Sequence, residues 1–327
     1  MSLLTVSNLY KHYPLSSKRV VCAVNGISFS IKQGETFGLV GESGCGKSTA
    51  GRLIAGLIEP TGGAIEFGGV NLAALSGEKR KRLPQDIQIV FQDPYGSLNP
   101  RKKVKAIVEE TMLLLGEQDK AARRRRVVEI LKRVELDESC LDKYPIQLTQ
   151  GEQQRIGVAR AFVTRPKLVV LDEPTSLLDI RFRGEIVRLL KRLQQETGCA
   201  YLFISHDLNI VHQISHQVGV MYLGRMVEQG EADQIFYDPQ HPYTRALLSA
   251  TLFPDPQRKR EKFHLEGEAP SPVNLSDRRC NFGPRCAFES DRCRSSLPVL
   301  TPLDEHHSVA CFHPQSDRVL MPDRAGA

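Results

Sequence analysis

The chain has 327 residues, more than the roughly 100–200 residues of one ordinary core, so two or three structural modules are expected. Hydrophobic residues make up 41% and charged residues 25%, which excludes a disordered or fibrous chain. No apolar stretch reaches the roughly 18 residues needed to cross a bilayer, and the N-terminus lacks the pattern of a signal peptide. These features predict a cytoplasmic protein without a membrane span of its own.

The formal net charge of +6 lies entirely in residues 1–250, because the last 77 residues hold eleven Lys/Arg and eleven Asp/Glu. A basic run, Arg123 to Arg126, falls within a helical pattern and is interpreted as a solvated helix face. The chain has no Trp, and aromatic residues do not interleave with the basic ones as a base-stacking surface requires. Nucleic acid is therefore not expected as a partner.

In chain order, residues 1–35 alternate apolar and polar side chains, which predicts half-buried strands. Residues 36–41 form a short apolar strand that runs into a glycine-rich loop, and residues 48–58 follow a helical pattern. Residues 60–72 predict a turn-rich strand region. The segment from about 100 to 165 predicts helices.

Two compact apolar runs, residues 167–174 and 200–207, end in acidic or histidine residues, as buried parallel strands do. A helical pattern over residues 183–198 separates them, which predicts a β-α-β unit. From about residue 251 the texture changes, since nine of the nineteen prolines fall in the last 77 residues. The prediction is an α/β domain over 1–250 with a helical insertion at about 100–165, followed by an irregular, proline-rich extension over 251–327.

A phosphate-binding pattern, G-x-x-x-x-G-K-[ST], spans residues 41–48 between the predicted strand and helix. Its glycines let backbone N–H groups turn inward around phosphate oxygens at the positive end of the helix. Lys47 can reach the β- and γ-phosphates, and the Ser48 hydroxyl can ligate Mg²⁺. The candidate nucleotide-binding residues of this loop are Gly41, Glu42, Ser43, Gly44, Cys45, Gly46, Lys47, Ser48 and Thr49.

An acidic pair, Asp172 and Glu173, ends the first of the two apolar runs. Asp172 is placed to hold Mg²⁺ through its water shell. Glu173 points elsewhere and can polarise the water that attacks the γ-phosphate. An acidic pair after an apolar strand could be a solvated strand end, but downstream of the phosphate-binding loop it favours nucleotide hydrolysis.

Four of the eight cysteines, Cys22, Cys45, Cys140 and Cys199, are scattered singly and are interpreted as small buried hydrophobes or incidental thiols. The other four fall in the extension with the spacing C-x₅-C-x₆-C-x₁₇-C, which matches neither a zinc ribbon nor a ferredoxin. A proline-rich segment without periodic apolar residues needs a cross-link to hold a fold. In a reducing compartment a bound metal is favoured over disulfides for this role. The four candidates are Cys280, Cys286, Cys293 and Cys311, and unliganded thiols stay an alternative.

These motifs, together with Leu148-Thr149-Gln150-Gly151-Glu152, which precedes the acidic pair, resemble those of ABC transporter ATPases in their expected order over residues 1–250. The resemblance implies a RecA-like core with an antiparallel β subdomain and a helical subdomain. It implies catalytic roles for Gln92, also a Mg²⁺ ligand, and for His206, the γ-phosphate sensor. Further implied site residues are Tyr13, stacked on adenine; Thr149, Gln150, Gly151 and Glu152, the signature that completes a partner's ATP site; and Asp179 of the D-loop.

The signature departs from the family's usual Leu-Ser-Gly-Gly-Gln. Thr149 keeps a hydroxyl, and Gly151 keeps the close backbone approach to phosphate. Gln150 and Glu152 add bulk and a negative charge, whose effect is expected at the partner's ATP. The D-loop has Leu177 where the family usually has Ala, a small change.

Residues 91–104 and 241–250 narrow the resemblance to the dipeptide/oligopeptide/nickel importers, most closely to their second ATPase subunit, the F-type. This implies an ATP-hydrolysing subunit that powers import of peptides, or of a related solute such as nickel. The implied partners are a second ABC ATPase subunit (a heterodimer, with a homodimer as the alternative), two transmembrane permeases and, indirectly, an extracytoplasmic solute-binding protein. The implied location is the cytoplasmic face of the bacterial inner membrane, as a peripheral protein.

The same resemblance implies a [4Fe–4S] cluster on the four cysteines of the extension, with zinc and unliganded thiols as the alternatives. Two other functions stay open: a soluble ABC ATPase acting on nucleic acid, and the ATPase of a phosphonate-degrading lyase complex. The first usually carries two cassettes in one chain, and this chain has one. The cysteine-bearing extension argues against the second.

Overall fold

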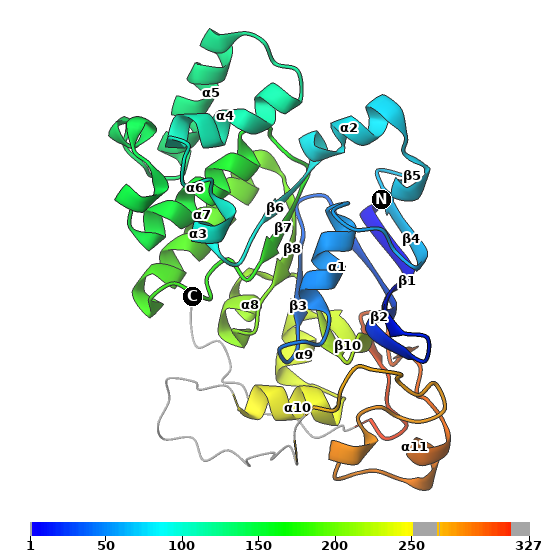
Figure 1. The fold of residues 1–327 in the computed structure, drawn as a ribbon. Coiled ribbons are helices and arrows are strands. Elements are labelled where there is room, and N and C mark those ends of the chain that lie inside the picture. The colour runs from blue at the N-terminus through cyan, green and yellow to red at the C-terminus, as the bar shows by residue number, and fades with distance from the viewer. Residues whose placement is uncertain (1, 251–266, 268, 315–327) are drawn as a thin grey trace.

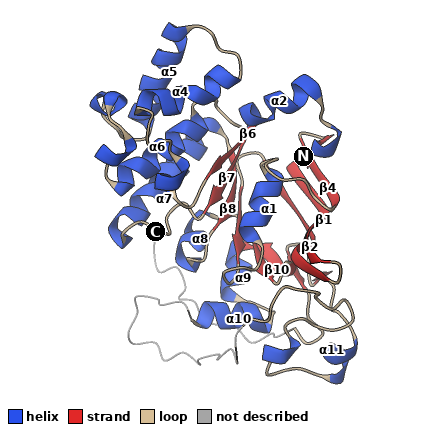
Figure 2. Cartoon of the chain, in the orientation of Figure 1, coloured by secondary structure: helices blue, strands red, loops and turns tan. Residues whose placement is uncertain are grey.

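The computed structural model describes residues 2–250, 267 and 269–314, and two sheets organise them (Figures 1 and 2). The central sheet contains β3 (Thr36–Val40), β6 (Ile87–Val90), β7 (Leu168–Asp172), β8 (Ala200–Ile204), β9 (Gln217–Tyr222), β10 (Arg225–Glu231), β11 (Thr301–Pro302) and β12 (His307–Val309). Its order is β11-β12-β10-β9-β3-β8-β7-β6, parallel from β9 to β6 and antiparallel at the other end. The second sheet is antiparallel, in the order β2-β1-β4-β5: β1 (Ser2–Ser16), β2 (Arg19–Lys32), β4 (Gly62–Phe67) and β5 (Val70–Asn71).

Some helices cover the central sheet. Others form a separate group at one side of it, and α4 and α5 of this group lie far from α11 (Figure 1). The α-helices are α1 (Lys47–Ile54), α2 (Gly77–Asp86), α3 (Pro94–Ser97), α4 (Val104–Leu114), α5 (Lys120–Arg133), α6 (Gln150–Phe162), α7 (Ile180–Thr197), α8 (Leu208–Ile214), α9 (Ala232–Tyr237), α10 (Pro242–Ser249) and α11 (Asp291–Ser295). Short 3₁₀ turns occupy η1 (Leu72–Ala74), η2 (Glu138–Asp142), η3 (Pro145–Gln147) and η4 (Gly283–Arg285). In the described part of the chain, no helix is both long and apolar enough to cross a bilayer.

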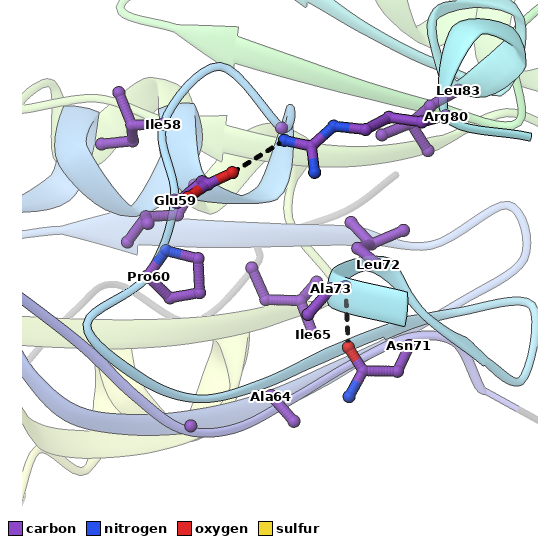
Figure 3. Close-up of a pocket in the computed structure, with 13 residues that line it drawn as sticks. Ile58, Glu59, Pro60, Ala64, Ile65, Asn71, Leu72, Ala73, Arg80 and Leu83 are labelled. Carbon is purple, nitrogen blue, oxygen red and sulfur yellow. Dashed lines mark hydrogen bonds and ion pairs between the residues drawn. The ribbon is translucent and has the colours of Figure 1, made fainter. Parts of the chain in front are cut away.

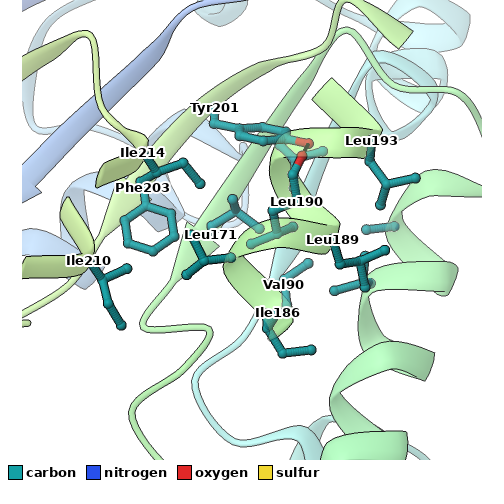
Figure 4. Close-up of a cluster of buried hydrophobic side chains, with 14 of the residues drawn as sticks. Val90, Leu171, Ile186, Leu189, Leu190, Leu193, Tyr201, Phe203, Ile210 and Ile214 are labelled. Atoms are coloured by element: carbon teal, nitrogen blue, oxygen red, sulfur yellow. Dashed lines mark hydrogen bonds between the residues drawn. The ribbon is translucent and has the colours of Figure 1, made fainter. Parts of the chain in front are cut away.

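The predicted α/β core is confirmed, because every residue of β3, β7 and β8 is buried, as continuous apolar runs require. Helix α7 lays its apolar stripe on this sheet, and its Ile186, Leu190 and Leu193 lie close to Tyr201 and other core side chains (Figure 4). The Tyr201 hydroxyl donates a hydrogen bond of 2.9 Å to the Leu190 carbonyl, which satisfies a polar group inside the core. This packing fixes the ends of β7 and β8, where the candidate site residues lie.

The basic run corrects one expectation from the sequence. Arg124, Arg125 and Arg126 are exposed, as a solvated helix face requires. Arg123 is buried, its Nε lies 3.1 Å from Glu109 Oε1, and its Nη1 donates to the Glu117 carbonyl at 2.7 Å. The first arginine therefore joins α5 to α4, because it points back toward the neighbouring helix.

The extension is joined to the core more closely than expected of the irregular segment that the sequence predicts. Most of residues 269–300 form loops, as predicted, but β12 pairs with β10, and β11 pairs with β12, so the central sheet continues into the extension. Glu228 of β10 is fully buried, its Oε1 lies 2.8 Å from Nε2 of His307 of β12, and it accepts the backbone N–H groups of Gln240 and His241. The boundary near residue 250 stays a prediction.

Burial of His241 predicts an acid-sensitive fold. The buried ring accepts the Tyr243 N–H at Nδ1, and burial lowers the pKa of His241 to about 3. The unfolded chain binds a proton on this ring below about pH 6.5, so stability falls by about 1.4 kcal/mol for each pH unit between there and pH 3.

We expect His241→Asn to remove this dependence, because Asn still caps the first turn of α10. Urea unfolding at about pH 7 and about pH 5 measures it: the wild type should lose about 2 kcal/mol more than the variant between the two pH values. Equal losses in the two proteins would contradict the assignment to His241.

Candidate nucleotide site

The phosphate-binding loop joins β3 to α1 and fits only with glycine at its two ends. Gly41 has φ +147°, and a Cβ there would lie 2.2 Å from the Met221 carbonyl oxygen. Gly46 has φ +107°, and its Cβ would lie 2.0 Å from the Ala23 carbonyl oxygen. The close approach of β2 and β9 therefore requires these glycines and fixes the loop against both sheets.

Lys47 is buried, and its ammonium lies within the loop. Its Nζ donates to the carbonyl oxygens of Gly41, at 2.7 Å, and Glu42, at 2.9 Å. Cys45 lies beside it, with Sγ 3.7 Å from Nζ, and burial raises the pKa of the Cys45 thiol. The ammonium therefore lies at the N-terminus of α1, where phosphate oxygens are bound in loops of this kind.

Ser48 and Asp172 come together from different elements. Helix α1 packs across β7 and β8, so the Ser48 hydroxyl donates to Asp172 Oδ1 at 2.8 Å. Burial raises the pKa of the Asp172 carboxyl, and the Ser48 hydrogen bond lowers it in part. Hydroxyl and carboxylate oxygens are the ligands that Mg²⁺ prefers, so this pair fits a Mg²⁺ site. Gln92 follows β6 and is exposed, and among the described residues no hydrogen bond joins it to Ser48 or Asp172.

Glu173 and His206 face each other beyond the ends of β7 and β8. His206 Nδ1 lies 2.6 Å from Glu173 Oε2, with side chains 56% and 13% exposed, respectively. Glu173 has φ +50°, which is strained for a residue with a side chain, and its N–H donates to the Ile204 carbonyl. The neighbouring strand thus holds the backbone in a turn that separates the Glu173 carboxylate from Asp172.

Tyr13 belongs to the antiparallel sheet. It pairs with Val21 of β2, two residues from the Ala23 carbonyl that contacts the loop at Gly46. The ring is partly exposed, and Lys11 Nζ lies 5.1 Å from its centroid. Tyr13 lies on β1, which pairs with the strand that adjoins the phosphate loop, and its exposed ring is available to stack on a base.

The signature residues begin α6, where Thr149 is the N-cap. Thr149 Oγ1 accepts the Glu152 N–H, and Glu152 accepts the Thr149 N–H at 2.7 Å, which forms a reciprocal capping box. The Thr149 N–H lowers the pKa of the Glu152 carboxyl. Glu152 therefore keeps a capping box that the family's usual Gln can also form. Gln150 is exposed, and Gly151 is half-buried.

The D-loop precedes α7, and Asp179 is the N-cap position of that helix. Three large apolar side chains around it, Leu177, Ile180 and Phe182, are exposed by 47%, 82% and 41%. In the described part of the chain, no hydrogen bond links the D-loop or signature residues to residues 41–49. The signature and the D-loop therefore expose polar and apolar side chains at the surface, and these side chains are available to contact another molecule.

Sequence reasoning missed two residues that hold Glu42 of the phosphate loop and a third that packs against both of them. The Tyr243 hydroxyl accepts the Glu42 N–H at 2.8 Å, and the Arg285 guanidinium pairs with the Glu42 carboxylate at 2.9 and 3.0 Å. Tyr222 packs between them, with its ring centroid 4.8 Å from that of Tyr243. The 241–250 string marks Tyr243 as part of a motif, but no sequence pattern connects Arg285 with a residue 243 positions away.

The four cysteines of the extension line one cavity, together with the aromatic residues Phe282, Phe288 and Phe312. Burial raises the pKa of the Cys280 and Cys286 thiols, and that of Cys311 to about 11. Within the described ranges, no three His, Cys, Asp or Glu side chains surround a single metal-ion position. The cysteines Cys22, Cys45, Cys140 and Cys199 are buried singly, as predicted.

A separate cavity of about 240 Å³ lies between the end of α1, β4 and α2 (Figure 3). Its lining is largely apolar, and the ion pair between Glu59 Oε1 and Arg80 Nη2, 3.2 Å apart, crosses it. No residue of the phosphate loop lines this cavity. It is therefore distinct from the nucleotide site.

Comparison with known proteins agrees with this geometry. Residues 24–176 match the ABC transporter family, and residues 227–293 match the oligopeptide/dipeptide transporter C-terminal region. The chain is 43% identical over 316 residues to the dipeptide transport ATP-binding protein DppF of Haemophilus influenzae, covering 95% of this chain and 96% of the relative. It is 46% identical over 314 residues to the putative oligopeptide transport ATP-binding protein YkfD of Bacillus subtilis, covering 95% of each.

Solved structures show the same fold. The ATP-binding cassette MJ0796, in a dimeric post-hydrolysis state with ADP and Pi, superposes with a TM-score of 0.64 at 29% identity, covering 70% of this chain and 98% of that one. The cbiO1 protein of Clostridium perfringens, part of a cbiONQ ABC transporter complex, also gives 0.64 at 33% identity, covering 72% and 90%.

Proposed function

Because the chain belongs to the ATP-binding subunits of dipeptide and oligopeptide ABC transporters, we propose that it hydrolyses ATP to drive peptide import through membrane-embedded permeases. The observation that carries this proposal is the convergence of Lys47, Ser48 and Asp172 beside the Glu173–His206 pair. These five side chains provide a phosphate-binding cation, metal-binding oxygens and a general base with a hydrogen-bonding partner. The name F-type subunit rests on similarity to proteins called DppF and AppF.

Each side chain has a proposed role. Lys47 and the loop N–H groups bind the β- and γ-phosphates, and Tyr13 stacks on the base. Ser48, Asp172 and Gln92 hold Mg²⁺, which neutralises charge on the phosphate oxygens when bound. Glu173 orients the attacking water and accepts its proton, and His206 senses the γ-phosphate once it releases the Glu173 carboxylate.

A second ATPase subunit is proposed to complete the site. The solved cassette that resembles this chain is a dimer. Among the described residues, no hydrogen bond joins the signature or the D-loop to residues 41–49, and Leu177, Ile180 and Phe182 are exposed beside the D-loop. Thr149, Gln150, Gly151 and Glu152 then contact the partner's ATP, and Asp179 lies at the shared interface. Closure around two ATP molecules stores binding energy, and hydrolysis reopens the pair.

Permease subunits are the proposed membrane partners, and the chain itself is proposed to lie on the cytoplasmic face of the membrane. Helix α3 follows Gln92 and exposes Tyr95, an aromatic anchor suited to a protein interface. The tagged chain, purified from a detergent extract of its own cells, should retain a second ATPase and two membrane proteins. Recovery with only soluble proteins or nucleic acid would instead support a non-transport ATPase.

A [4Fe–4S] cluster is the proposed ligand of the cysteine cavity. All four cysteines line one cavity, and a [4Fe–4S] cluster takes one thiolate on each of its four irons, so the number of thiols fits a cluster. Cys280, Cys286, Cys293 and Cys311 are the proposed ligands. A cluster held there would join the segment around η4, helix α11 and the segment after β12. Its role would be structural, because ATP-driven import needs no redox step.

The cluster proposal predicts a coloured protein. Anaerobic purification should give about four irons per chain and visible absorption, both lost in Cys286→Ser. Cys140→Ser is the matched control, because Cys140 is buried far along the chain from the extension, and this variant should keep its iron. Colourless anaerobic protein without iron would contradict the proposal.

A further inference from the structure

We infer that Arg285, in the cysteine-bearing extension, is a positioning residue for the phosphate loop: it holds the Glu42 carboxylate away from the phosphates and so strengthens MgATP binding. The two side chains form a paired, fork-to-fork contact, with Nη1 2.9 Å from Oε2 and Nη2 3.0 Å from Oε1. Only 7% of the Arg285 side chain and 27% of the Glu42 side chain are exposed. The pair is therefore largely shielded from water and salt.

Glu42 needs such a partner because of its place in the loop. Its carbonyl oxygen accepts from Lys47 Nζ at 2.9 Å, and its N–H donates to the Tyr243 hydroxyl. The residue thus lies next to the ammonium that binds phosphate, and its own carboxylate is an anion in a site built for anions. Without Arg285, this charge would repel the phosphates of ATP and compete for Lys47.

The surroundings of Arg285 keep its guanidinium on Glu42. Its central carbon lies 5.9 Å from the Tyr222 ring centroid, and Phe282 packs edge-on against the same ring at 5.3 Å. The Glu42 carboxylate raises the pKa of Arg285 above its ordinary value, so the charge is permanent. The Tyr222 ring and the ion pair both favour the position of the guanidinium beside Glu42.

The same contact connects the ATP site with the cysteine cavity. Arg285 ends η4, between Cys280 and Cys286, and the Gly283 N–H donates to the Cys280 carbonyl at 3.2 Å. The Cys286 N–H donates to the Gly283 carbonyl at 2.9 Å, and the Cys280 N–H donates to the Cys293 carbonyl at 2.7 Å. Whatever orders these cysteines therefore also orders Arg285.

The test is a double-mutant cycle on the full chain, purified anaerobically, with MgATP binding measured by calorimetry. Arg285→Ala should weaken binding about tenfold when Glu42 is present, which corresponds to one charge-assisted hydrogen-bonded pair. In the Glu42→Gln background the same change should weaken binding less than about twofold, because no carboxylate remains to repel phosphate. Arg279→Ala is the matched control, since Arg279 is exposed one residue before Cys280, and its affinity should equal that of the wild type.

The two backgrounds separate positioning from a loss of structure. If Arg285→Ala weakens binding equally in both, or in neither, the inference is wrong. A second readout uses reciprocity: MgATP should slow amide hydrogen exchange of residues 280–286 in the wild type, and this protection should be lost in Glu42→Gln. Unchanged exchange in the wild type on adding MgATP would also overturn the link.

Discussion

Replacing Glu173 by Gln is expected to lower ATP hydrolysis by about 10²–10⁴-fold while MgATP binding is kept. The variant retains size and polarity but cannot accept a proton from the attacking water. Nδ1 of His206 lies 2.6 Å from the Glu173 carboxylate, and the Glu173 backbone has a strained φ of +50°. MgATP binding is kept because the substitution does not change Lys47, Ser48 or Asp172.

The measurement is steady-state phosphate release from the assembled complex, with MgATP binding measured in parallel. Glu196→Gln serves as the control, because Glu196 is an exposed residue of α7 outside the site and pairs only loosely with Arg192, at 3.9 Å. Wild-type turnover in the Glu173→Gln complex would remove Glu173 from the catalytic role.

Replacing Glu228 by Ala is expected to lower the free energy of unfolding by about 3–5 kcal/mol. This carboxylate is fully buried, and it accepts hydrogen bonds from two backbone N–H groups that precede α10. It also lies 2.8 Å from His307, whose strand joins the extension to the central sheet. Its loss leaves three buried polar groups without their partner.

Urea unfolding measures this change, and Glu231→Ala provides the comparison. Glu231 ends the same strand, but its contact with His306 is 3.4 Å long and solvent-exposed, so its removal should cost less than about 1 kcal/mol. Similar losses in the two variants would show that Glu228 does not anchor the extension.

Periodicity and motif spacing predicted the parts of the fold that are local in sequence. The apolar runs at β7 and β8 and the glycine pattern between β3 and α1 each carry their own signal, because burial on both faces and positive φ angles restrict residue type directly. Helix α2 gave no comparable signal: none of its residues is buried, and Pro84 lies within it. Strand β12 has only three residues, too few for a periodic pattern.

The residues of the candidate site also differ in whether their signal is local in the sequence. Lys47, Ser48, Asp172 and Glu173 were predicted because each lies at a fixed offset within a short motif, and the structure brings Ser48 to Asp172. Arg285 was not predicted, because its contact with Glu42 depends on how the extension folds back over β9 and α10. Long-range ion pairs of this kind have no sequence period and become visible only in three dimensions.

Peptide uptake by reconstituted vesicles tests the proposed function most directly. The complex that copurifies with this chain is placed in proteoliposomes with its solute-binding protein, and labelled di- and oligopeptides are offered with MgATP. Uptake should depend on MgATP with the wild-type chain and should be absent with Glu173→Gln, although that chain still binds MgATP. Equal uptake with the two chains, or ATP hydrolysis by the wild-type complex without movement of any peptide, would contradict the account.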